Sequence, residues 1–155
     1  MVLKEYSEAS KRHLQACEVL LAHLDAHSTQ GKKRALQETF YLTGYIFECI
    51  YKYAIYMLIG YDPQKPVHKL DENGLSYNRI KTHDLQILKD ELDSRISGNI
   101  PFIKHEDGID NSTITLYKKW HPNFRYQALR DIDEDGIRKF FDWSKRTREK
   151  ILENI

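Results

Sequence analysis

The chain has 155 residues, and its 24 lysines and arginines nearly balance its 23 aspartates and glutamates, which leaves a net charge of +1. This length predicts one domain over residues 1–155, built on a single hydrophobic core. The balanced charge excludes an overall field that would steer the protein toward nucleic acid or an anionic membrane. Any site for a polyanion must therefore be a local patch.

Apolar residues at helical spacing predict a first helix from Tyr6 to about His27, with Ser7 or Ser10 as its cap. A short polar segment that contains Gly31 follows, and a short connection makes the first two helices antiparallel neighbours. The N-terminal segment 1–13 has no apolar core of the kind found in a signal peptide. We therefore expect a cytoplasmic protein.

The longest apolar stretch runs from Arg34 to Tyr61 and predicts the helix around which the fold is organised. It is apolar on nearly all sides, so we expect it to lie at the centre of a bundle or to be shared with a second subunit. Glu48 and Lys52 interrupt the stretch and exclude a membrane span. They are four residues apart, which places them on one helix face as an ion pair. Gly44 predicts a close helix crossing.

Residues 61–82 predict a long surface connection, and Thr82 or Asp84 then caps a third helix from about His83 to Ser97. Its expected core residues are Leu85, Leu88, Leu92 and Ile96.

Residues 98–112 predict a second irregular stretch, followed by a short helix capped within residues 110–112. Residues 113–116 are also compatible with a short strand. The last helix begins near Asp133. Its expected inward residues are Ile137, Phe140, Phe141, Ser144, Arg148, Ile151 and Leu152. The fold class that these elements predict is all-α, an up-down bundle of four to five helices.

Phe40–Tyr53 resembles the second helix of HEPN domains, an aromatic-rich segment of the form YLxGYxxExxLK. The residues in the matching places are Tyr41, Leu42, Gly44, Tyr45, Glu48 and Lys52. The sequence THDL at residues 82–85 is similar to the start of the third HEPN helix. Arg125 and Tyr126 are similar to the RY that precedes the final helix in many members.

This resemblance implies a cytoplasmic helical bundle that forms a homodimer and acts in a bacterial toxin–antitoxin or phage-defence system, often beside a nucleotidyltransferase partner. Many HEPN proteins are metal-independent ribonucleases that use an Arg and a His four to six residues apart. In this chain the nearest such pair is Arg79 and His83, with three residues between them.

Three functions are therefore considered: an RNA-associated or interaction component without the standard nuclease motif, an active metal-independent ribonuclease with a cleft at the dimer interface, and a non-catalytic scaffold for a nucleotidyltransferase.

The candidate catalytic residues are His83, Asp84 and Arg79, because a His beside a carboxylate can act as a general base and an Arg can hold a phosphate. His83 and Asp84 are equally typical of a simple helix cap. The candidate interface or cleft residues are Tyr41, Tyr45, Glu48, Lys52, Arg125 and Tyr126. Glu48 and Lys52 can either line a cleft or only fix the register of the bundle.

Cys17 and Cys49 occupy apolar helical positions, which predicts buried, reduced thiols. The seven histidines are scattered, with neither HxxxH nor CxxC spacing, and no glycine-rich phosphate loop is present. We therefore expect neither a metal site nor a cofactor.

Overall fold

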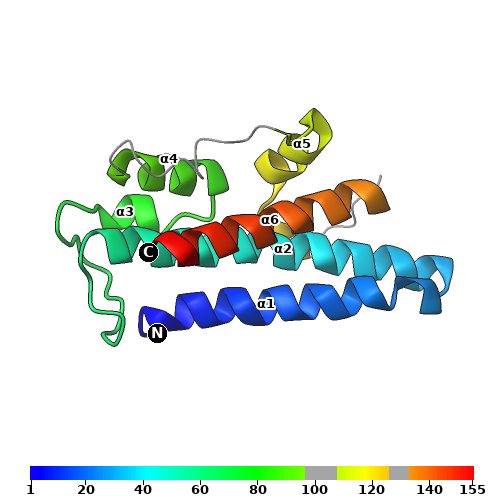
Figure 1. Ribbon diagram of the computed structural model, residues 1–155, viewed down its shortest axis with the longest axis horizontal. Coiled ribbons are helices and arrows are strands. Elements are labelled where there is room, and N and C mark those ends of the chain that lie inside the picture. The colour runs from blue at the N-terminus through cyan, green and yellow to red at the C-terminus, as the bar shows by residue number, and fades with distance from the viewer. Residues whose placement is uncertain (97–107, 126–132) are drawn as a thin grey trace.

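The computed structural model describes residues 1–96, 108–125 and 133–155, and the regular elements in these ranges are all helical. They are α1 (Lys4–Ala22), η1 (Leu24–Ala26), α2 (Thr29–Leu58), α3 (Tyr77–Ile80), α4 (Leu85–Arg95), α5 (Asn111–Lys119), η2 (Pro122–Arg125) and α6 (Glu134–Asn154). No strand occurs in the described ranges, which confirms the predicted all-α class (Figure 1).

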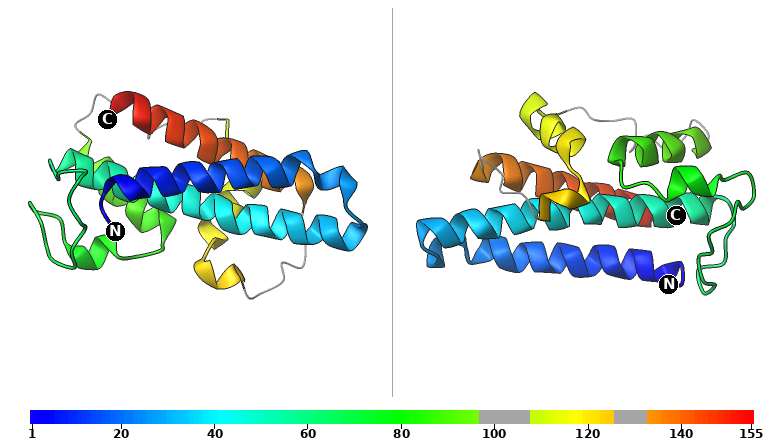
Figure 2. Two further views of the ribbon diagram at one scale, coloured as in Figure 1. Left: turned by 90° about the horizontal axis from the view of Figure 1, so that it is seen from below. Right: turned by 180° about the vertical axis from the view of Figure 1, so that it is seen from behind.

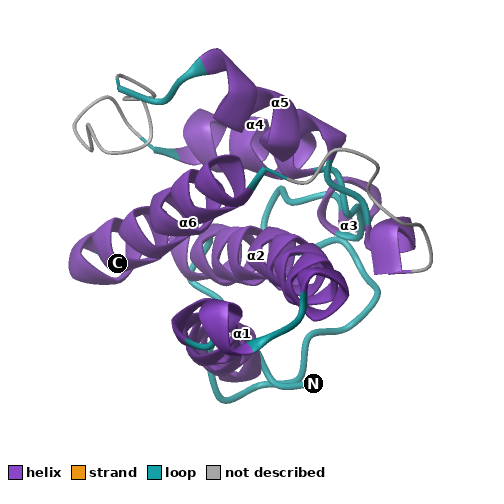
Figure 3. Ribbon diagram, turned by 90° about the vertical axis from the view of Figure 1, so that its right-hand side faces the viewer, coloured by secondary structure: helices purple, strands orange, loops and turns teal. Residues whose placement is uncertain are grey.

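Helix α2 is the centre of the molecule. In the view along its axis, α1 lies on one side of it while α4, α5 and α6 lie on the other (Figure 3). The helix ends because Gly60 adopts a φ of +78°, a left-handed conformation that costs little without a Cβ. The amides of Gly60 and Tyr61 then donate to the carbonyls of Met57 and Tyr56, which is the Schellman pattern of helix termination.

The helix directions depart from a strict up-down order. Helices α1 and α2 are antiparallel, as the short connection predicts, whereas α6 runs in the same direction as α2 (Figures 1 and 2). The long segment between α2 and α6, which contains α3, α4 and α5, returns the chain to the end from which α2 starts. The bundle is therefore present, with a more complex connectivity than predicted.

Aromatic rings from three helices fill the core between α2, α5 and α6. Phe47 lies at the centre of this group, with its ring centroid 5.1 Å from that of Tyr117, 5.5 Å from that of Phe140 and 5.3 Å from that of Trp143. The Tyr117 hydroxyl also lies 3.1 Å from the Tyr51 hydroxyl and 3.1 Å from the carbonyl oxygen of Leu85, so this buried polar group has hydrogen-bond partners.

Aspartate caps fix the starts of three helices near the predicted positions. The Asp84 carboxylate accepts from the first amides of α4, Asp110 accepts from Thr113 in α5, and Asp133 accepts from α6. Residues 113–116 are therefore helical rather than a strand. The four predicted core residues of α4 are all buried.

Several boundaries or faces differ from the sequence-based expectations. Helix α1 starts at Lys4 with Leu3 at its N-cap and no side-chain cap, so neither Ser7 nor Ser10 caps it, and it ends at Ala22, before the short helix η1. Helix α2 starts at Thr29 because Ser28 caps it and accepts from the amide of Gly31, so the polar residues before Arg34 are already helical. The short helix α3 interrupts the predicted connection 61–82. In α6, Leu152 is 37% exposed, while Trp143, which the predicted stripe omits, is buried. Most of the predicted irregular stretch 98–112 lies outside the described residues.

No helix among the described residues is long and apolar enough to cross a membrane. Both cysteines are buried and unpaired with each other, as the sequence predicts.

Candidate functional site

The site is built around an ion pair buried in α2. Lys52 Nζ lies 2.8 Å from Glu48 Oε1, and both side chains are only 7% exposed. They lie one helical turn apart on the same face of the central helix, and the helices that pack on α2 bury both side chains. A buried charge is tolerated only when it is paired, so removing either partner leaves the other uncompensated. The predicted Glu48–Lys52 pair is therefore confirmed.

His83 binds the same carboxylate from the segment between α3 and α4. Its Nδ1 lies 3.0 Å from both Glu48 oxygens. An ionised carboxylate can only accept, so Nδ1 carries the proton and neutral His83 has a lone pair on Nε2. The His83 side chain is 49% exposed, whereas Glu48 is buried. The structure thus presents a carboxylate-oriented imidazole to solvent, which is the arrangement of a general base.

The other two predicted catalytic residues do not converge on His83. The Asp84 carboxylate faces the start of α4, where its Oδ1 accepts from Gln86 and Ile87. Arg79 Nε donates to Glu91 at 2.8 Å. The carboxylate that contacts His83 is therefore that of Glu48, which the sequence analysis places in a cleft or in the register of the bundle rather than among the catalytic residues.

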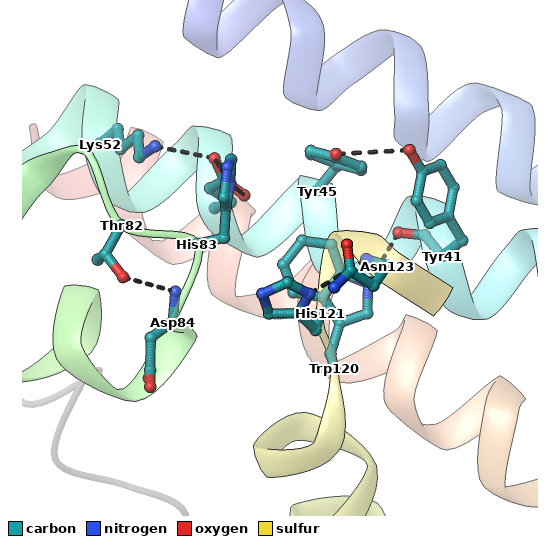
Figure 4. A network of polar contacts seen from close by, with 10 residues as sticks. Tyr41, Tyr45, Lys52, Thr82, His83, Asp84, Trp120, His121 and Asn123 are labelled. Carbon is teal, nitrogen blue, oxygen red and sulfur yellow. Dashed lines mark hydrogen bonds and ion pairs between the residues drawn. The ribbon is translucent and has the colours of Figure 1, made fainter. Parts of the chain in front are cut away.

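A second histidine, His121, lies beside His83. Their ring centroids are 6.5 Å apart with the planes at 77° (Figure 4). The backbone amide of Asn123 donates to His121 Nδ1 at 3.1 Å. This nitrogen is therefore the acceptor, and a neutral His121 carries its proton on Nε2. The two rings thus differ in role: His83 offers an acceptor, and His121 offers a donor.

Trp120 holds this second histidine in place on α2. Its indole Nε1 donates to the carbonyl of Tyr41 at 3.0 Å, and its ring covers Gly44. A Cβ added to Gly44 would lie 1.8 Å from the Trp120 ring, so only glycine fits there. The close approach predicted at Gly44 is real, but its partner is a side chain rather than a crossing helix.

Tyr41 and Tyr45, the two tyrosines of the HEPN-like motif, form a half-buried surface next to Trp120. The Tyr41 hydroxyl donates to that of Tyr45 at 3.4 Å (Figure 4). Arg125 lies over the Tyr41 ring, with its Cζ 5.9 Å from the centroid. The His13 ring of α1 packs on Tyr45 at 5.6 Å. Burial, together with Arg12, lowers the pKa of His13, which favours the neutral form of this third histidine. Tyr126 lies outside the described residues.

A cleft of about 430 Å³ opens on the α4–α5 side of the histidine pair. Lys118, Lys119 and His121 line one wall, while Asp84 and Gln86 line the other. Both lysines are exposed, and neither has a carboxylate partner among the described residues. The Lys119 ammonium is oriented by the ring of Phe124, 5.8 Å from its centroid. Because the overall charge is close to zero, a polyanion could bind only at a local basic patch, and these two lysines form such a patch.

The sequence already offers Lys118 and Lys119 as phosphate ligands, together with Arg125 and with Arg130, which lies outside the described residues. Sequence reasoning missed His121 and Trp120 at this site. The only available signal was the cluster KKWH at residues 118–121, which joins basic residues to an aromatic and an imidazole. This cluster lies next to His83 because of tertiary packing, and the local periodicity of a sequence does not indicate a contact of that kind.

No cluster of three or more His, Cys, Asp or Glu side chains suited to a metal ion is present in the described parts of the chain. Comparisons with protein-family models, with curated proteins and with solved structures gave no significant match to this chain.

Proposed function

We propose that this protein is a HEPN-like ribonuclease of a bacterial toxin–antitoxin or defence system, with His83 as the general base. The observation that carries the proposal is the contact of His83 Nδ1 with both oxygens of the buried Glu48 carboxylate. The contact fixes the imidazole tautomer, and the carboxylate stabilises the imidazolium that forms when Nε2 takes a proton.

The reaction that fits this geometry is transesterification of RNA. His83 Nε2 removes the proton of a 2′-hydroxyl, and the 2′-oxygen attacks the adjacent phosphorus. The bond from phosphorus to the 5′-oxygen breaks, and water protonates the leaving oxygen. The products are a 2′,3′-cyclic phosphate and a 5′-hydroxyl. The nucleophile belongs to the substrate, so the step requires a base and charge stabilisation but no metal-bound water.

His121 has a different part in this step. Its Nδ1 accepts from the Asn123 amide, so a neutral His121 can donate a hydrogen bond from Nε2 to a phosphoryl oxygen. Such a donor stabilises the charge that develops on the phosphate without transferring a proton.

The test is cleavage of total RNA and of tRNA by purified protein in EDTA. We expect cleavage by the wild type and a loss of about 10²- to 10⁴-fold in rate for His83→Ala, the usual contribution of a general base. The matched control is His27→Ala, because His27 is exposed next to the start of α2. Equal rates for wild type and His83→Ala would refute the assignment of the base.

A second candidate function is RNA binding or partner scaffolding without cleavage. It is favoured by the commitment of Asp84 to the α4 cap and of Arg79 to Glu91, because the two residues proposed to act with His83 already have structural partners. Intact RNA in the cleavage assay, together with RNA binding, would support this function. Co-purification with a nucleotidyltransferase would instead support the scaffold, and the half-buried Tyr41 and Tyr45 are the proposed contact surface for such a partner or for a second copy.

A further inference from the structure

We propose that the cleft between the start of α4 and the end of α5 is a phosphate-binding subsite for single-stranded RNA. This inference rests on the proposed function, because it names the part of the protein that holds the substrate backbone next to His83. The residues that would contact the phosphates are Lys118, Lys119 and His121.

The first argument is electrostatic. Two adjacent lysines project from the last turn of α5, and no described carboxylate neutralises them. The carboxylate that does line the cleft, Asp84, has its Oδ1 occupied by two amides of α4 at 2.9 and 3.1 Å. These hydrogen bonds do not remove the charge of Asp84, but two lysines outnumber one carboxylate in the lining, so the net charge of the cleft is positive. Phosphate contacts of this kind supply most of the affinity of proteins that bind nucleic acid without sequence preference.

The second argument is the hydrogen-bonding state of His121. Its Nδ1 accepts from the Asn123 amide, which leaves an Nε2–H donor on the ring that lines the cleft. A phosphoryl oxygen is an acceptor only, so it matches this tautomer. The same ring lies 6.5 Å from the His83 ring, so a phosphate bound here is beside the proposed base (Figure 4).

The third argument is the rigidity of the wall. Trp120 lies between the lysines and His121 in sequence, is 4% exposed, and is fixed on Gly44 and the Tyr41 carbonyl. The backbone that carries the three ligands is thus anchored to the central helix, as a preorganised site requires.

The experiment measures binding in the absence of chemistry. The probe is a fluorescent single-stranded 2′-O-methyl oligouridylate, which has no free 2′-hydroxyl and is not cleaved by transesterification. Its dissociation constant is measured by anisotropy over a range of NaCl concentrations. We expect binding that weakens steeply with salt. Each lysine that contacts a phosphate contributes about 0.7 to the slope of log K against log salt.

The variant Lys118→Gln/Lys119→Gln should lower the magnitude of that slope by about 1.4 and weaken binding at low salt. The matched control is Lys11→Gln/Lys33→Gln, which removes the same charge from exposed positions on α1 and in the first turns of α2. An unchanged slope in the cleft variant, or an equal change in the control, would overturn the subsite. Equal displacement of the probe by poly-glutamate at the same charge concentration would also overturn it.

His121 gives a second, independent readout. His121→Ala should weaken binding of the probe about tenfold, the usual effect of losing a hydrogen bond to a charged group. His121→Gln, which keeps an N–H donor, should retain most of the affinity. Equal affinity of the Ala variant and the wild type would refute the role of His121.

The outcomes separate this inference from the proposed function. Salt-dependent binding of the probe, combined with intact RNA in the cleavage assay, would refute the ribonuclease and leave the subsite standing. Cleavage of RNA that is insensitive to the two lysines would refute the subsite alone.

Discussion

The packing of the Trp120 ring on Gly44 gives a specific prediction about stability. Gly44→Ala would place a methyl group 1.8 to 2.0 Å from three atoms of the Trp120 ring, far inside van der Waals contact. Overpacking of this kind costs about 1–3 kcal/mol, and the Trp120–Tyr41 hydrogen bond, lost when the ring moves, costs about 1 kcal/mol more. Alanine regains about 1 kcal/mol of helix propensity. The expected net destabilisation is therefore about 1–3 kcal/mol.

The same substitution should change sign when the indole is absent. Trp120→Ala alone should cost about 3–5 kcal/mol, because the side chain is buried. On that background Gly44→Ala no longer meets the indole ring, so it should stabilise the protein by about 1 kcal/mol through helix propensity. The measurement is urea unfolding of the four proteins followed by far-ultraviolet circular dichroism. The packing argument would be refuted if Gly44→Ala stabilised the wild-type protein, or if it lowered the free energy of unfolding equally in the wild type and in Trp120→Ala.

Three further predictions concern charge and burial. Glu48→Leu should destabilise the protein by about 3–5 kcal/mol because it leaves Lys52 buried without a partner, while Glu48→Leu/Lys52→Met should be close to neutral. Urea unfolding midpoints test both variants, and an equal loss of stability in the two would refute the argument. Hydrogen bonds from Thr113 hold the pKa of Asp110 well below its usual value. The ionised Asp110 therefore stabilises the folded protein above about pH 4, and this stabilisation is lost as pH falls. Asp110→Asn should make the free energy of unfolding less dependent on pH in this acidic range. Burial raises the pKa of both cysteines to about 12, so Ellman's reagent at pH 8 should label neither thiol in the folded protein and both in urea, whereas rapid labelling of the native protein would contradict their burial.

Much of the fold could be predicted because its signals are local. The aspartate caps of α4, α5 and α6 and the inward leucines of α4 can be identified from residues within one or two helical turns. The apolar pattern predicts the start of α2 too late for the same reason. Its first turns are polar and exposed, so apolar periodicity does not mark them, although Ser28 is a good cap.

The site could be predicted only in part, because its central contacts join distant segments. The sequence identified the Glu48–Lys52 pair and His83, but it grouped His83 with its neighbours Asp84 and Arg79. In the structure those neighbours have local structural partners, and His83 is bound by a carboxylate from another helix. His121 reaches His83 through the packing of Trp120 on Gly44, and neither residue type alone indicates that the two will meet.

Helix α2 combines the core of the fold with the support of the candidate site. A buried ion pair seldom stabilises a protein more than apolar residues of the same volume, so the presence of Glu48 and Lys52 in this apolar helix is not explained by stability. It is explained if the carboxylate is needed to orient His83, with Lys52 compensating its charge. The same helix anchors His121 through Trp120. Substitutions in α2 must then affect stability and the site together, whereas the exposed His83, His121 and cleft lysines can be changed without disturbing the core, and only these give a clean test of function.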